Sequence, residues 1–167
     1  KAIQKRNEIT NSVEELQGMN FSVEMETGTG KTYVYLRTVY ELNKLYGFKK
    51  FVIVVPSVAI REGVLKNLQI THEHFQSLYD KTSINFDIYD SKKVSNLRGF
   101  SSGNAIQVLV INIDSFAKDE NIINKPNDKL TGKKPIEFIP STKPIVIVDE
   151  PQNMETGIRK KAIQNLE

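Results

Sequence analysis

Residues 25–32 read METGTGKT, and this stretch decides the fold. It follows residues 21–25, which predict a short strand. It precedes residues 31–46, where apolar side chains recur at helical spacing. Gly28 and Gly30 let the backbone turn its N–H groups toward an anion, which also meets the positive end of the following helix. A strand, a glycine-bearing turn and a helix in this order, with Gly-Lys-Thr at the junction, predict a phosphate-binding loop.

The loop predicts ATP and Mg²⁺ as ligands. The residues expected to contact the nucleotide are Thr27, Gly28, Thr29, Gly30, Lys31 and Thr32. Lys31 would reach the β- and γ-phosphates and take part in catalysis, while the Thr32 hydroxyl would bind Mg²⁺. The general pattern G-x-x-x-x-G-K-[ST] has a glycine at the position of Met25, which is its least constrained position.

A second motif, IVIVDEPQ, occupies residues 145–152. Four β-branched residues predict a buried strand that carries Asp149 to its carboxyl end, where open α/β sheets bind ligands. Asp149 could hold the Mg²⁺ water shell, and Glu150 could polarise the attacking water. An acidic turn ahead of Pro151 would also explain these carboxylates, but the phosphate loop upstream favours a nucleotide site.

The remaining pattern predicts an open α/β sheet of mostly parallel strands with helices on both faces. Ser57 is placed to cap a helix that extends toward Asp80. A further amphipathic helix is expected over residues 1–17. The strands after the phosphate loop are expected at residues 51–55, 84–89, 105–113 and 145–148.

Composition is that of one globular domain over residues 1–167, with 39% hydrophobic and 26% charged residues. Cysteine is absent, which is compatible with a reducing cytosol, and no apolar stretch is long enough to span a bilayer, so we expect a cytoplasmic protein without a membrane span. The net charge of +3 does not by itself indicate nucleic-acid binding. Because the chain begins at Lys1 and not at Met, we expect a fragment of a longer polypeptide.

Residues 118–144 differ in composition from the rest of the chain. They hold four prolines, one glycine and six lysines, with acidic residues that partly offset the lysine charge. We expect a surface insertion between two core strands.

The two motifs together resemble motifs I and II of superfamily 2 helicases and translocases. DEPQ, together with PSVAIREGV at residues 56–64, resembles the ATPase region of the restriction subunit of type III restriction–modification enzymes. This resemblance covers most of the chain. It implies a RecA-like P-loop fold in which Lys31 and Thr32 handle phosphate and magnesium. It further implies that Asp149 serves the metal, Glu150 activates water, and Gln152 couples the γ-phosphate state to a partner domain.

The resemblance also implies a nucleic-acid face. Pro56 and Ser57, together with residues 112–115, including Asn112 and Ser115, would face the DNA backbone. A helix cap at Ser57 and a capping turn at Asp114 and Ser115 are equally plain interpretations of these residues.

The function implied is that of the first of two motor domains in a DNA-dependent ATPase that couples hydrolysis to translocation for endonucleolytic restriction of foreign DNA. Its expected partners are double-stranded DNA, a second motor domain and a nuclease domain of the same polypeptide, and a separate methylation subunit. Without the second domain the isolated fragment is expected to be nearly inactive. Two alternatives remain: another superfamily 2 DNA or RNA helicase without nuclease activity, and a nucleotide-gated switch module.

Overall fold

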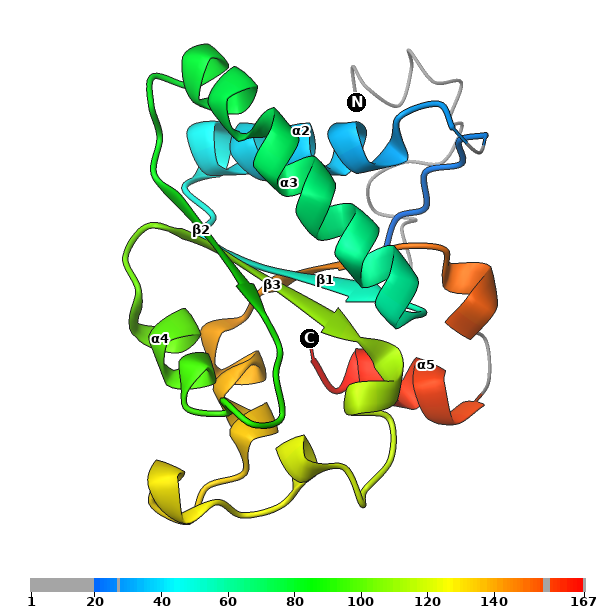
Figure 1. Cartoon of the computed structure of the whole chain (residues 1–167), viewed down its shortest axis with the longest axis vertical. Coiled ribbons are helices and arrows are strands. Elements are labelled where there is room, and N and C mark those ends of the chain that lie inside the picture. The colour runs from blue at the N-terminus through cyan, green and yellow to red at the C-terminus, as the bar shows by residue number, and fades with distance from the viewer. Residues whose placement is uncertain (1–19, 27, 155–156, 167) are drawn as a thin grey trace, which may run out of the picture. The chain divides into compact units, whose positions relative to one another are not determined.

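A computed structural model describes residues 20–26, 28–154 and 157–166 of the chain (Figure 1). The chain divides into two compact units, Lys1–Lys31 and Thr32–Glu167, and each is described by itself. The helix expected over residues 1–17 lies outside the described residues. In the described part, no helix is both long enough and apolar enough to cross a membrane.

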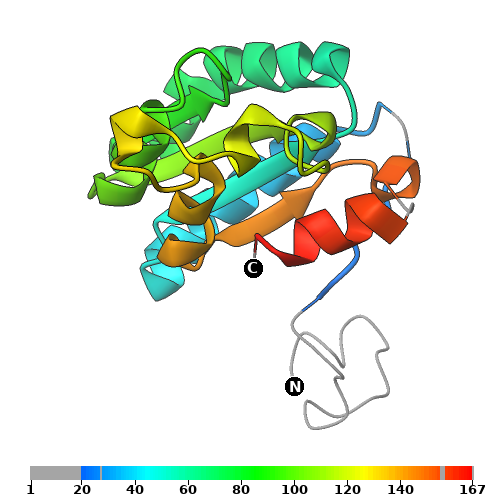
Figure 2. The same ribbon diagram turned by 90° about the horizontal axis from the view of Figure 1, so that it is seen from below.

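A four-stranded sheet forms the centre of the second unit, with the order β2-β3-β1-β4 (Figures 1 and 2). Its strands are β1 (Lys50–Val55), β2 (Ile84–Ile88), β3 (Ile106–Asn112) and β4 (Ile145–Val148). All three strand pairings are parallel, so the predicted parallel α/β class is confirmed. Each of the four strands lies at its predicted position to within a residue at either end.

Two long helices cover one face of this sheet. They are α2 (Lys31–Tyr46), which matches the predicted helix, and α3 (Val58–Leu78), which begins after its cap Ser57 (Figure 1). Phe51, Ile53 and Val55 of β1 are fully buried against these helices. Because successive side chains of a strand point to opposite faces, Val52 and Val54 belong to the other face.

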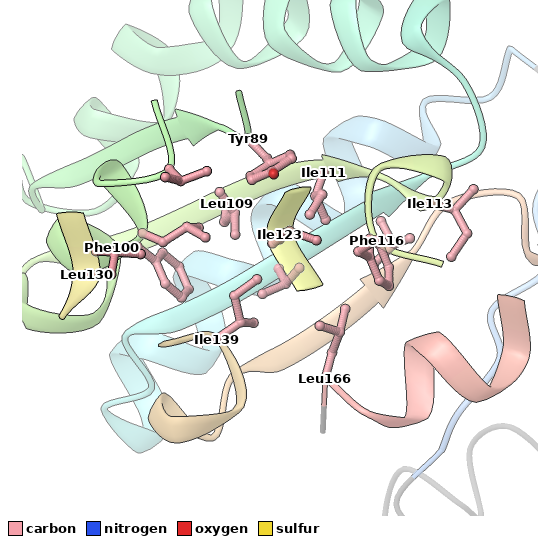
Figure 3. Close-up of a cluster of buried hydrophobic side chains, with 14 of the residues drawn as sticks. Tyr89, Phe100, Leu109, Ile111, Ile113, Phe116, Ile123, Leu130, Ile139 and Leu166 are labelled. Atoms are coloured by element: carbon pink, nitrogen blue, oxygen red, sulfur yellow. The ribbon is translucent and has the colours of Figure 1, made fainter. Parts of the chain in front are cut away.

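That other face carries shorter elements. They include α4 (Asn96–Ser102), α5 (Gly157–Gln164) and five 3₁₀ turns after β3: Ile113–Ser115, Ile122–Asn124, Asp128–Leu130, Pro135–Phe138 and Pro140–Thr142. Figure 3 shows the apolar side chains that they direct toward the sheet. Phe100 of α4 and Leu166, just after α5, are both fully buried there.

The lysine-rich segment is anchored in this second cluster. Ile123, Leu130 and Ile139 are buried beneath it, while most of its charged side chains are exposed (Figure 3). The segment follows β3 and precedes β4, as expected for an insertion between two core strands.

The strand predicted at residues 21–25 is a wrong prediction. These residues have no regular secondary structure, and the side chains of Phe21 and Val23 are 72% and 76% exposed. A strand requires a neighbour for its backbone hydrogen bonds, and none of the described residues pairs with this segment. Helices α4 and α5 were not predicted from the sequence.

Candidate nucleotide site and nucleic-acid face

The phosphate loop forms a tight turn within the first unit. Gly28 and Gly30 have φ angles of 82° and 90°, a region in which L side chains are strained. The Thr29 backbone N–H and hydroxyl both donate to the Glu26 carbonyl oxygen, at 3.3 and 2.6 Å. A Cβ at either glycine would meet no atom within 4 Å, so the need for glycine here comes from the backbone angle and not from lack of space.

The other predicted loop residues follow directly along the chain. Lys31 ends the first unit and is the first residue of α2, with its side chain partly buried. Thr32 is the next residue of that helix and opens the second unit. The placement of Thr27 lies outside the described residues.

The acidic motif follows the edge strand β4. The backbone N–H of Asp149 donates to the Val54 carbonyl oxygen at 2.9 Å, which continues the ladder one residue beyond the strand. Parallel strands β1 and β4 therefore deliver Asp149 to the carboxyl end of the sheet, as predicted. Asp149 and Glu150 are both partly buried, and Gln152 is exposed.

Tyr35 links the two predicted Mg²⁺ ligands of the second unit. Burial raises the pKa of its phenol, the Thr32 side chain lowers this pKa in part, and the negative charge of Asp149 raises it further. Its hydroxyl is buried and makes no hydrogen bond of standard geometry among the described residues. Thr32 and Asp149 thus both lie within electrostatic reach of one side chain, one helical turn into α2.

Glu150 adopts an unusual backbone conformation. Its φ angle is 54°, in the left-handed region, and it precedes Pro151. Such backbone strain persists only where the surroundings hold it, and it is common at functional sites. The Asn153 side-chain amide donates to Glu150 Oε2 at 3.0 Å, and the Asn153 backbone N–H donates to the Glu150 carbonyl at 3.0 Å. The sequence analysis did not identify Asn153, although it lies directly after the DEPQ motif.

The predicted nucleic-acid residues follow strands β1 and β3, which pair with Val55 opposite Asn112. Pro56 and Ser57 therefore lie at the same end of the sheet as the turn after β3. The Ser57 hydroxyl accepts from the Ile60 backbone N–H at 3.3 Å, and the Asn112 side chain accepts from the Asp114 backbone N–H at 3.0 Å. Both side chains thus serve as caps, and Asn112 is only 7% exposed.

A groove of about 970 Å³ opens at the same end of the sheet, beside β2 and the turn after β3. Of the predicted nucleic-acid residues, Asp114 and Ser115 line it. The charged residues of its wall are Arg61, Asp87, Asp90, Lys92, Lys93, Asp114 and Glu120. Its three basic residues were not predicted from the sequence as candidates for binding; Arg61 lies one turn after the Ser57 cap.

The sheet order, the phosphate loop and the acidic strand end define a RecA-like domain of the helicase type. The sequence model of the family described as "Type III restriction enzyme, res subunit" matches residues 2–166. The chain therefore belongs to the family of type III restriction enzyme Res subunits, which confirms the resemblance seen in the motifs.

Individual relatives agree with this assignment. The chain is 35% identical over 151 residues to the type III restriction-modification enzyme StyLTI Res subunit of Salmonella typhimurium. The matched region covers 79% of this chain and 15% of the relative. It is 32% identical over 164 residues to the EcoP15I Res subunit of Escherichia coli, and this match covers 87% of this chain and 17% of the relative. The EcoPI Res subunit of Escherichia phage P1 is 31% identical over the same share of this chain. The chain thus spans about a sixth of the length of these relatives.

Proposed function

We propose that this chain is the ATP-binding part, and the first of two motor domains, of a DNA-dependent ATPase in the restriction subunit of a type III restriction–modification enzyme. The geometry that supports the proposal is the position of Asp149 at the carboxyl end of the sheet, where its backbone N–H donates to the Val54 carbonyl oxygen at 2.9 Å, together with that of Thr32 in the first turn of α2. A hydroxyl at a helix start and a carboxylate at a strand end, both of which influence the pKa of Tyr35, match the Mg²⁺ ligands that a P-loop ATPase uses. Family membership over residues 2–166 supports the same assignment.

The residues of the site have separate tasks in this proposal. The backbone N–H groups from Thr27 to Gly30 bind phosphate oxygens, and Lys31 neutralises charge that develops on the β- and γ-phosphates. Thr32 and Asp149 hold Mg²⁺, which supplies positive charge at the transferred phosphoryl group.

Glu150 and Gln152 act on the γ-phosphate side. The Glu150 carboxylate accepts a proton from the attacking water, and such general-base catalysis contributes about 10² to 10⁴ in rate. Gln152 has an exposed side chain and lies two residues after Glu150, whose backbone is strained. It contacts the γ-phosphate and couples nucleotide binding to the second motor domain.

DNA binds at the carboxyl end of the same sheet. The backbone around Pro56, Ser57 and Asn112 and the Ser115 side chain contact DNA phosphates, and the caps at Ser57 and Asn112 keep these turns in shape. Lys92 and Lys93 of the groove wall supply positive charge for a phosphate, beside the carboxylates of Asp87, Asp90, Asp114 and Glu120. These contacts bind the backbone and carry no sequence information, so sequence recognition belongs to the methylation subunit.

The whole cytoplasmic enzyme would add the second motor domain, which can contribute an arginine finger, and a nuclease domain. Because an arginine finger is worth about 10³ to 10⁵ in rate, the 167-residue chain alone is expected to hydrolyse ATP barely at all. Robust DNA-independent turnover by this chain would contradict the proposal.

Steady-state ATP hydrolysis by the full-length protein with its methylation subunit, with and without duplex DNA, tests the function. Strong stimulation by duplex DNA supports the translocase. Stimulation by RNA alone would favour a helicase of another kind, and no stimulation by either nucleic acid would favour a nucleotide-gated switch.

A further inference from the structure

A continuous chain of polar contacts connects Glu150 to the wall of the groove. The Asn153 side-chain amide donates to Glu150 Oε2 at 3.0 Å. Arg159 Nη1 donates to the Asn153 carbonyl oxygen at 3.0 Å, and Arg159 Nη2 donates to Asp114 Oδ1 at 2.7 Å. Asp114 is itself a wall residue of the groove. The proposed water-activating carboxylate and the proposed DNA face are therefore joined through one guanidinium group.

The helix that carries Arg159 is fixed by apolar contacts. Ala162 and Ile163 of α5 pack against the core cluster that contains Phe116 and Met154, and Leu166 just after the helix is fully buried. The guanidinium can then donate in two directions from a fixed position, because its N–H groups form a planar fork. A lysine ammonium at this position would be a single point charge without that geometry.

The Asp114 end of the chain of contacts is equally well held. Its backbone N–H donates to the Asn112 side chain at 3.0 Å, and its carbonyl oxygen accepts from the Asn121 side-chain amide at 3.1 Å. Its carboxylate shares the groove wall with Lys92 and Lys93. A phosphate held by these lysines would repel the Asp114 carboxylate and attract the Arg159 guanidinium.

Stability does not explain this arrangement. The side chains of Arg159 and Asp114 are 32% and 60% exposed, and ion pairs so open to water contribute little to folding. Glu150, by contrast, has a strained backbone φ of 54°, and Asn153 donates both to its carbonyl oxygen and to its carboxylate. The contacts of Asn153 and Arg159 can therefore serve to orient the Glu150 carboxylate.

We propose that Arg159 is a positioning residue, which sets the direction of the Glu150 carboxylate through Asn153 and makes that direction depend on what occupies the groove at Asp114. A DNA phosphate bound at Lys92 and Lys93 changes the relative strength of the two hydrogen bonds that Arg159 donates, one to Asp114 and one to the Asn153 carbonyl oxygen. This change moves the Glu150 carboxylate into line with the attacking water. This inference rests on the proposed function and identifies a route by which DNA stimulates hydrolysis.

The test uses the full-length protein with its methylation subunit and compares Arg159→Ala, Asp114→Ala and the double variant. We expect each single variant to lower kcat for ATP at saturating duplex DNA about tenfold, the worth of one charge-assisted hydrogen bond. The KM for ATP should stay within about twofold, because the phosphate loop is untouched. The double variant should be no slower than either single variant, since both break the same route.

Arg37→Ala is the matched control. Arg37 forms an exposed ion pair with Glu41 at 3.9 Å on α2, away from the contacts of Glu150, and its loss should leave kcat unchanged. Stimulated turnover at the wild-type rate in Arg159→Ala or Asp114→Ala, or multiplied losses in the double variant, would overturn the coupling alone. A wild-type enzyme that DNA does not stimulate would overturn the proposed function and this inference with it. Asp114→Ala changes an exposed side chain, so it keeps the test decisive should Arg159→Ala fail to fold.

Discussion

At the scale of single residues, the site combines strained backbone with a small number of charged groups. Glu150 holds a φ of 54°, which costs about 1–3 kcal/mol for a residue other than glycine. Gly28 and Gly30 reach similar angles without that cost. The glycines thus allow the phosphate loop to turn freely, whereas the conformation of Glu150 depends on contacts such as the one from Asn153.

The division of labour between Lys31 and Glu150 predicts different defects in the full-length enzyme. Glu150→Gln removes the proton acceptor, so kcat should fall about 10²- to 10⁴-fold with nucleotide binding retained. Lys31→Ala removes a phosphate contact and should weaken ATP binding itself. Steady-state kinetics and equilibrium binding of a labelled nucleotide separate the two effects. Normal turnover by Glu150→Gln would exclude the water-activating role.

The buried hydroxyl of Tyr35 predicts a stabilising substitution. It makes no hydrogen bond of standard geometry among the described residues, and the nearby Thr32 side chain offsets only part of the desolvation cost of burying it. Tyr35→Phe should raise the free energy of unfolding by about 1 kcal/mol, measured by urea denaturation. Tyr46→Phe is the control, because this ring at the end of α2 is 69% exposed and should have no effect. A loss of stability in Tyr35→Phe would indicate that its hydroxyl bonds Thr32 or Asp149 in solution.

At the scale of elements, sequence periodicity predicted those that bury a continuous apolar face. Strand β1 reads KFVIVV and α2 repeats its apolar residues at helical spacing, so both were predicted with bounds correct to one residue. Helix α4 reads NLRGFSS and has poor helix formers; burial of Leu97 and Phe100 holds it in place, which no local pattern reveals. The strand predicted at residues 21–25 does not form, because a strand needs a neighbour to pair with and none of the described residues pairs with this segment.

In the candidate site too, some residues could be placed from the sequence and others only from the folded structure. Asp149 and Glu150 follow a strand whose type is evident from the sequence, so their position at the sheet end was predictable. Asn153, Arg159 and Asp114 come together only through the packing of α5 and the turn after β3, and nothing in their spacing indicates contact. Long-range contacts of exposed polar groups leave no periodic signal in a sequence.

The segment between β3 and β4 provides a matched test of its anchoring. Ile123 is fully buried, whereas its neighbour Ile122 is 50% exposed. Ile123→Ala should therefore destabilise the protein by about 2–5 kcal/mol. Ile122→Ala should cost less than about 1 kcal/mol, since little buried apolar surface is lost. Urea unfolding of the two variants decides the matter; equal effects would show that the segment does not pack on the sheet in solution.

At the scale of the whole molecule, the parallel sheet separates two layers of the second unit, and each layer carries different residues of the proposed sites. The α2 and α3 layer carries Thr32 and the Ser57 cap, and the opposite layer carries Asp114 and Arg159. Because all four strands are parallel, the turns that follow them meet at one end of the sheet. Asp149, the proposed Mg²⁺ ligand of the second unit, therefore lies at the same end of the sheet as the proposed DNA contacts.

Both layers bury a tyrosine hydroxyl, and this predicts a loss of stability in alkali. Burial, with a smaller effect from Tyr79, raises the pKa of Tyr40 to about 12, and burial with the charge of Asp90 raises the pKa of Tyr89 to about 12. An unfolded tyrosine ionises near pH 10, as the ordinary value requires. The folded state therefore binds more protons than the unfolded state between these values, and its stability is complete below about pH 10 and is lost as the pH rises toward about 12.

Urea unfolding across this alkaline range should show the free energy of unfolding falling steadily above about pH 10. Tyr89→Phe removes one of these contributions, so its stability should fall less steeply with pH than that of the wild-type protein. Tyr46→Phe, which alters an exposed ring, should follow the wild-type slope. A pH dependence identical in Tyr89→Phe and wild type would mean that Tyr89 ionises in the folded protein as readily as in the unfolded chain, and that water reaches its hydroxyl beneath the groove.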